Sequence, residues 1–195
     1  TYYAGIYAAR VDTTVLNWQL VGLLPEPAAY GATVTNGDSL LFIGGNNAEH
    51  SLKSVYSIHL NVTGDKAEVH RLAELPCTID NMAVAMSGNG KGQWDIVAAV
   101  PGSPRVQPVS VATDGNVYVW GGFYVNGENS EVHTDGYCLN TKTGEWTALA
   151  TPRSVNGKET TLSGGIAWTE GKRVFATGGV NKDIFLDAIS GRYEF

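Results

Sequence analysis

The sequence predicts an all-β protein assembled from four-stranded antiparallel blades, which is the architecture of a β-propeller. Three apolar runs end in a glycine pair, at Gly44-Gly45, Gly121-Gly122 and Gly178-Gly179. Glycine allows the backbone to turn where a Cβ atom would clash. The second pair is followed by Tyr137 and Trp146, and aromatic rings in such positions fill the wedge between neighbouring blades.

The spacing of tryptophan and proline gives the length of the repeat. A strand-ending tryptophan is followed after 6 or 7 residues by a proline that opens the next blade, in the pairs Trp18 and Pro25, Trp94 and Pro101, and Trp146 and Pro152. Pro25 and Pro76 are 51 residues apart, as are Pro101 and Pro152. A kelch blade has about 50 residues, so the sequence predicts the kelch form of the propeller.

The repeat divides the chain into five segments of one partial propeller domain. Residues 25–75 and 101–150 each contain a complete blade, residues 1–24 contain the outer strands of another, and residues 151–195 open a further one. The turn residues and apolar runs predict no long helix and strands at 6–8, 18–21, 31–34, 40–43, 54–60, 67–71, 108–112, 117–120, 137–139, 146–148, 162–168 and 174–177.

The remaining segment, residues 76–100, is about half a repeat long. It begins at Pro76 and ends in Gln93-Trp94 as a blade does, but Gly88 to Gly92 replace its glycine-pair and tyrosine strands. Either this blade is stunted in the protein, or residues are missing from the sequence. Since propellers close with about four to eight blades, we expect the chain to be part of a larger ring.

Composition excludes several functional classes. The 195 residues are 43% hydrophobic and 16% charged, so the chain can bury a core and is not disordered. The net charge of −6 and the lack of a lysine and arginine cluster argue against a nucleic-acid partner. No apolar run has the length of a membrane span, and the first residues lack the pattern of a signal peptide.

The cysteines and histidines form no metal-binding pattern. Cys77 and Cys138 lie in or beside strand-like segments, which favours buried free thiols over a disulfide. The four histidines lack the spacing of metal ligands, and no carboxylate-rich loop lies near them. We therefore expect neither a metal nor another cofactor.

The blade openings supply the candidate binding residues. Arg105 lies just before an innermost strand, and in a propeller this strand is nearest to the axial channel. Two alternatives remain open for Arg105: it binds an anionic ligand, or it hydrogen-bonds loop carbonyls and ties blades together. Polar or aromatic residues occur near the other openings, and we predict that they surround the same end of the channel: Tyr30, Asn81, Glu159 and Asn181.

Three motifs resemble the bacterial N-acetylneuraminate (sialic acid) mutarotases, also called epimerases. They are Pro-Gly-Ser-Pro-Arg at 101–105, Asp-Gly-Asn-Val-Tyr-Val-Trp-Gly-Gly at 114–122 and Ala-Thr-Gly-Gly-Val-Asn-Lys-Asp-Ile-Phe at 176–185. The resemblance implies a six-bladed kelch propeller, periplasmic or secreted, which interconverts the anomers of sialic acid. Residues 24–75 resemble the family's final blade, so the chain looks like a cyclically permuted branch.

The resemblance assigns no catalytic residue to this chain. The acid/base pair proposed for the family lies in a Gly-Glu-x-Lys-Pro-Gly-x-Arg motif, which does not occur in these 195 residues. Opening the hemiketal ring requires one group to take a proton and another to give one, and the substrate carboxylate calls for an arginine such as Arg105. The alternative function is a non-enzymatic kelch module that binds a glycan or protein through its blade loops.

Overall fold

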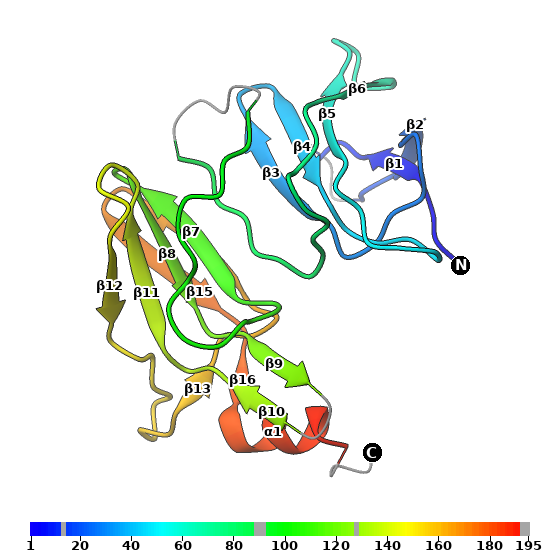
Figure 1. Ribbon diagram of the computed structural model, residues 1–195. Helices are drawn as coiled ribbons and strands as arrows, with labels where there is room; N and C mark the ends of the chain where they lie inside the picture. The colour runs from blue at the N-terminus through cyan, green and yellow to red at the C-terminus, as the bar shows by residue number, and fades with distance from the viewer. Residues whose placement is uncertain (13–14, 88–92, 127–128, 192–195) are drawn as a thin grey trace. The chain divides into compact units, whose positions relative to one another are not determined.

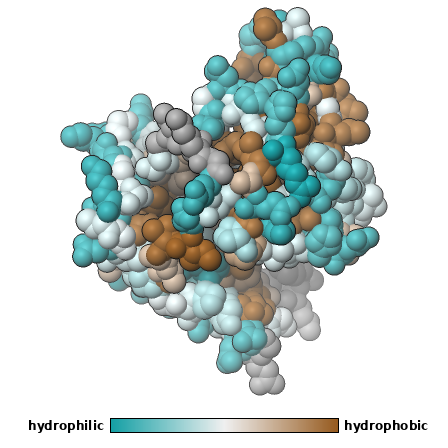
Figure 2. All heavy atoms as spheres, turned by 45° about the horizontal axis from the view of Figure 1, so that its top comes forward, coloured by the Kyte–Doolittle hydropathy of each residue, from teal (hydrophilic) through white to brown (hydrophobic). Residues whose placement is uncertain are grey.

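The computed structural model describes residues 1–12, 15–87, 93–126 and 129–191. They form two compact units (Figure 1): unit 1 contains residues 1–81 and 93–96, and unit 2 contains residues 82–87 and 97–191. Almost all regular structure is β-strand, and no helix of the described residues is long and apolar enough to cross a membrane. On the face shown in Figure 2, hydrophobic residues form patches among hydrophilic ones.

Unit 1 contains a complete kelch blade, here called blade A. Its four antiparallel strands pair in sequence order: β3 (Ala32–Asn36), β4 (Ser39–Ile43), β5 (Val55–Leu60) and β6 (Ala67–Arg71). Gly37, at φ +60°, makes the tight β3–β4 turn that the sequence predicts. Leu41 and Ile43 point to the same face of β4, and with Val55 and Tyr56 they form the buried core of the blade.

Unit 2 contains a second blade of the same plan, here called blade B. Its strands are β7 (Val109–Thr113), β8 (Asn116–Trp120), β11 (Gly136–Asn140) and β12 (Trp146–Leu149). Tyr137 on β11 packs edge-on against Trp146 on β12, with ring centroids 6.4 Å apart. Blade B thus forms a four-stranded antiparallel sheet with the same strand order as blade A.

Two further strand pairs occur beside the complete blades. In unit 1, β1 (Gly5–Ala8) pairs with β2 (Gln19–Leu23), and β2 packs against β6, where Gly22 lies close to Ala67. In unit 2, β14 (Ile166–Glu170) pairs with β15 (Arg173–Thr177), and β14 packs against β7. The predicted strand at 162–168 starts only at Ile166 because Gly164 turns the chain at φ +71°.

A small assembly that the repeat does not predict lies at one end of blade B. It consists of the hairpin β9 (Phe123–Asn126) and β10 (Asn129–Val132), the short pair β13 (Thr160–Thr161) and β16 (Val180–Asn181), and helix α1 (Lys182–Ile189). Phe185 of α1 contacts Phe123 of β9 edge-to-face at 5.3 Å. With 8 residues, α1 agrees with the expectation of no long helix.

The described part of segment 76–100 contains no strand. The outer strand expected at Gln93-Trp94 does not form, and the Trp94 indole instead donates a hydrogen bond to the Ala73 carbonyl at 2.9 Å. Both cysteines are free, but Cys77 is exposed rather than buried because no sheet surrounds it. The break or stunted blade predicted at Gly88 to Gly92 lies outside the described residues.

Candidate functional site

Four residues share an unusual conformation at the openings of the blades. Tyr30, Gln107 and Gly164 each lie two residues before the first strand of a blade, and Asn81 holds the same position after Pro76 as Tyr30 after Pro25. Their φ angles are +56°, +52°, +71° and +51°, which is the left-handed region. We call these four the blade-start residues.

Backbone hydrogen bonds join consecutive blade-start residues within each unit. In unit 1, the Asn81 N–H donates to the Tyr30 carbonyl at 2.9 Å, and in unit 2 the Gly164 N–H donates to the Gln107 carbonyl at 3.2 Å. The structure thus holds Tyr30 and Asn81 next to each other in unit 1. The other predicted site residues belong to unit 2, so the common mouth remains a prediction.

Arg105 is occupied by contacts inside unit 2. Its side chain is 4% exposed, and the guanidinium forms an ion pair with Asp135, with Nη1 to Oδ1 at 3.1 Å. It also donates to the carbonyls of Gly121 and Pro101, at 3.1 and 3.3 Å, and lies over the ring of Tyr137. Arg105 therefore hydrogen-bonds loop carbonyls as in the second alternative, but these partners belong to blade B itself, so the contacts hold the opening of one blade rather than tie two blades together.

Asp135 makes the stability of unit 2 decrease at acid pH. Burial raises the pKa of this carboxyl, but hydrogen bonds from Arg105 and Tyr137 and the Arg105 charge leave the pKa below its usual value. Such a group stabilises the fold above its unfolded pKa of about 3.9, and the stabilisation is lost as the pH falls through the folded pKa.

We therefore expect the melting temperature of unit 2 to fall as the pH drops below about 4. Asp135→Asn should remove part of this fall, because asparagine does not titrate there. Thermal melts followed by tryptophan fluorescence at several pH values check the expectation. Parallel profiles for the wild type and Asp135→Asn would contradict it.

In blade A the charged residue on the opening segment is an acid, whereas in blade B it is an arginine. Ser54 and Tyr56 occupy the positions that Asp135 and Tyr137 occupy in blade B, since Ser54 and Asp135 each accept a hydrogen bond from the first glycine of the glycine pair. Both side chains donate to Glu26, the Tyr56 hydroxyl at 2.7 Å. The acid thus lies on the opening segment in blade A, and the cation does so in blade B.

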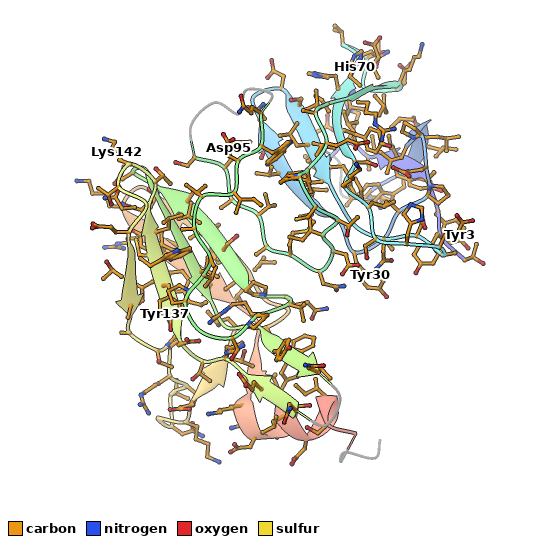
Figure 3. The ribbon with its side chains drawn as sticks, viewed as in Figure 1. Tyr3, Tyr30, His70, Asp95, Tyr137 and Lys142 are labelled. Atoms are coloured by element: carbon orange, nitrogen blue, oxygen red, sulfur yellow. The ribbon has the colours of Figure 1, made fainter. Side chains whose placement is uncertain are left out.

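Asp80 makes the surroundings of Tyr30 and Asn81 rigid. Its carboxylate accepts hydrogen bonds from Asn46 at 3.1 Å, from Asn81 at 3.0 Å and from Ser51 at 2.8 Å. These bonds lower the pKa of Asp80 below its usual value. Tyr30 itself lies on the loop before β3 at the end of blade A (Figure 3) and is 61% exposed.

Glu159 and Asn181 have local partners in unit 2. Glu159 pairs with Lys182 at 3.3 Å. The Asn181 carboxamide oxygen accepts from the backbone N–H groups of Asp183 and Ile184, so Asn181 caps the first turn of α1. An asparagine followed by an acidic residue is the signal that predicts such a helix start.

Sequence reasoning missed two of the blade-start residues, Gln107 and Gly164. Glu159 was predicted at the opening of the last blade, but the chain reaches the left-handed turn only at Gly164, 12 residues after Pro152. The useful signal is local: Tyr30 and Gly164 each precede a glycine that leads into a first strand. Among the described residues, no cluster of histidine, cysteine and carboxylate side chains could hold a metal ion.

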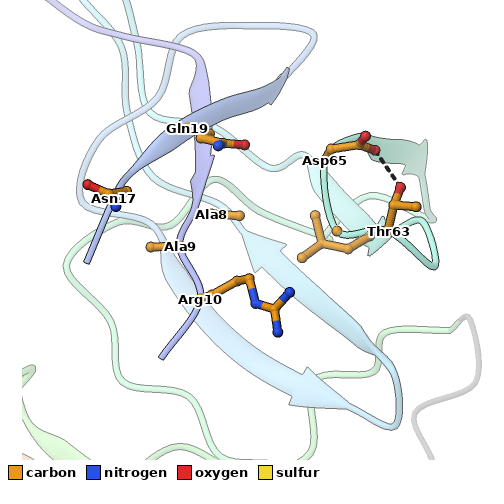
Figure 4. A pocket seen from close by; sticks show the side chains of 9 residues that line it. Ala8, Ala9, Arg10, Asn17, Gln19, Thr63 and Asp65 are labelled. Carbon is orange, nitrogen blue, oxygen red and sulfur yellow. Dashed lines mark hydrogen bonds between the residues drawn. The ribbon is translucent and has the colours of Figure 1, made fainter. Parts of the chain in front are cut away.

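A pocket of about 400 Å³ lies at the other end of blade A (Figure 4). Arg10 and Gln19 line it from the β1–β2 hairpin, and Thr63 and Asp65 line it from the β5–β6 turn. Since β5 runs from the glycine-pair end at Val55 toward this turn, the pocket and Tyr30 lie at opposite ends of the strands. The pocket is therefore separate from the blade-start residues.

Residues 82–191 match a family model described as N-acetylneuraminate epimerase. The chain belongs to this family. N-acetylneuraminate epimerases of Shigella flexneri serotype 5b (strain 8401) and Escherichia coli (strain K12) are each 35% identical to it over 94 residues. That alignment covers 48% of this chain and 24% of each relative, so the matched part spans about a quarter of their length.

A solved structure described as "Structure of YjhT" is also similar to this chain, with 23% sequence identity and a TM-score of 0.39. The match covers 85% of this chain and 38% of the solved chain. The match to the N-acetylneuraminate epimerase family includes Arg105, Gln107, Glu159 and Asn181, whereas Tyr30 and Asn81 precede it. Blade B is thus the complete blade that carries the family relationship.

Proposed function

We propose that this chain is part of a sialic acid mutarotase, an isomerase that interconverts the α and β anomers of N-acetylneuraminate. The observation that carries the proposal is the match of residues 82–191 to the N-acetylneuraminate epimerase family. The names of the relatives from Shigella and Escherichia agree with it. Because the alignment covers about a quarter of those relatives, the proposal extends beyond the residues it matches.

The reaction requires two proton transfers and no change of oxidation state. The anomeric hydroxyl loses a proton, the ring C–O bond breaks to give the open-chain keto acid, and the ring oxygen gains a proton. Closure on the other face of the ketone gives the other anomer. We propose that blade-start residues contact the sugar, because the first strand of a blade lies nearest to the axial channel.

The substrate carboxylate needs a partner other than Arg105. This guanidinium is buried and already neutralised by Asp135. Turning it toward a ligand would break two charge-assisted hydrogen bonds and leave Asp135 without its cation. We therefore assign Arg105 to holding the opening of blade B rather than to binding the substrate.

Anomer exchange provides the test. A sialidase releases N-acetylneuraminate as the α anomer, and separate ¹H NMR signals follow its conversion to the β anomer. We expect the protein to accelerate the conversion at least about a hundredfold over buffer, as is usual for acid/base catalysis. Binding without acceleration would favour the alternative, a kelch module that only binds glycans. If the protein neither binds N-acetylneuraminate nor accelerates its conversion, the proposal is refuted.

A further inference from the structure

Tyr30 has a strained backbone and an exposed aromatic ring, and neither feature stabilises unit 1. Its backbone is left-handed at φ +56°, a conformation that bulky residues rarely adopt. The residue is 61% exposed, and none of the described residues hydrogen-bonds to the hydroxyl or stacks on the ring. Strained residues of this kind are concentrated at ligand sites, where the strain is held by the surrounding structure.

The other blade-start residues show that the turn itself needs no side chain. Gly164 makes it at φ +71°, and glycine adopts this conformation without strain. Tyr30, Asn81 and Gln107 nevertheless keep a side chain at this position. Folding alone would favour glycine over tyrosine at the opening of blade A, so the Tyr30 side chain points to a use other than folding.

The groups beside Tyr30 suit a sugar. The Asn81 N–H is bonded to the Tyr30 carbonyl at 2.9 Å, which fixes the two residues next to each other. Asp80 accepts from the Asn81 carboxamide and is held in turn by Asn46 and Ser51. An exposed aromatic ring beside fixed polar groups can pack on the apolar C–H face of a sugar while the polar groups bind its hydroxyls.

We propose that Tyr30 is the surface on which the sugar packs at the opening of blade A, with Asn81 as the polar contact beside it. This inference rests on the proposed function and adds to it the residues of unit 1 that touch the substrate. The apolar C–H face of the sugar ring, or its acetamido methyl group, lies against the Tyr30 ring.

Tyr30→Gly tests the proposal because it moves stability and binding in different directions. The change relieves the left-handed strain and removes the ring, so the melting temperature should stay unchanged or rise by up to about 4 °C. The Kd for N-acetylneuraminate, titrated by saturation-transfer NMR, should rise at least about tenfold. Tyr30→Phe keeps the ring and should retain the wild-type Kd within about twofold.

Asp114→Gly is the matched control, because it also places glycine at a left-handed position but removes no side chain from the proposed sugar site. Asp114 is left-handed at φ +51°, but it lies in the tight turn between β7 and β8, away from the blade openings. It should show a similar effect on the melting temperature and no change in Kd. A rise in Kd for Asp114→Gly as large as that for Tyr30→Gly would overturn the proposal.

Two further outcomes would also overturn it. Wild-type affinity in Tyr30→Gly would mean that the ring does not touch the sugar, and a clear loss of stability would mean that the ring supports unit 1.

N-acetylglucosamine and galactose serve as second probes in the same titration. If the wild type binds one of these two sugars but not N-acetylneuraminate, and Tyr30→Gly does not bind that sugar, Tyr30 is a sugar-binding surface and the sialic acid function is refuted. If the wild type binds none of the three sugars, both the Tyr30 proposal and the sialic acid function are refuted.

Discussion

Replacing Asp135 with alanine is expected to destabilise unit 2 by about 3 kcal/mol. The change leaves Arg105, whose side chain is 4% exposed, without its counter-charge and with carbonyl oxygens as its remaining acceptors. Removing one partner of a buried ion pair costs about 3–5 kcal/mol, and the lower end applies because Asp135 is itself 41% exposed and water can take part of its place. Urea denaturation followed by circular dichroism measures the loss.

Two companion variants separate charge from packing at this pair. Asp135→Asn keeps a hydrogen-bond acceptor for Arg105 and should cost about half as much. The double variant Arg105→Leu/Asp135→Ala removes the unpaired charge and should recover part of the loss. A single-variant loss of less than about 0.5 kcal/mol would show that the ion pair does not hold the blade opening.

Gly179→Ala is expected to destabilise unit 2 by at least about 3 kcal/mol and to reduce the yield of folded protein. A Cβ atom at this position would lie 2.1 Å from the Thr161 carbonyl oxygen, and the residue has φ +87°. The backbone of β13 would therefore have to move away from β16, where Thr161 pairs with Val180.

Gly157→Ala is the matched control for Gly179→Ala. Gly157 has a similar φ of +77°, but a Cβ atom there would meet nothing within 4 Å. Its replacement should cost only the conformational strain, about 1–2 kcal/mol. Equal losses in the two variants would mean that the clash with Thr161 is relieved without cost, which would contradict the close packing after the third glycine pair.

The blades could be predicted from sequence because their signals are local and repeated. The glycine pairs, the tight turns and the apolar runs each fix a few neighbouring residues, and blades A and B follow them closely. Helix α1 and the β9–β10 hairpin were missed because each lies in the connection that follows a glycine pair, where the sequence does not repeat from blade to blade. The start of α1 still carried a local signal in Asn181 and Asp183.

The candidate site was harder to predict because it depends on partners far apart in the chain. Arg105 and Asp135 are separated by 30 residues, and only the fold shows that they neutralise each other. The left-handed backbone of Tyr30 and Gln107 could not be read from sequence either, because tyrosine and glutamine seldom adopt it. The backbone hydrogen bond that joins Tyr30 and Asn81 is likewise visible only in the fold, because the two residues are 51 positions apart.

The opposite polarity of the two blade openings limits how this propeller can evolve by exchange of its repeats. Placing the opening segment of blade A in front of β7 would bring Glu26 to the side chain of Asp135 in place of Arg105. Two carboxylates would then share one half-buried position, where like charges repel. The reverse exchange would set Arg105 against the hydroxyls of Ser54 and Tyr56, with no carboxylate to balance it. Each opening is therefore matched to its own third strand, and duplication or shuffling of blades must carry the two segments together.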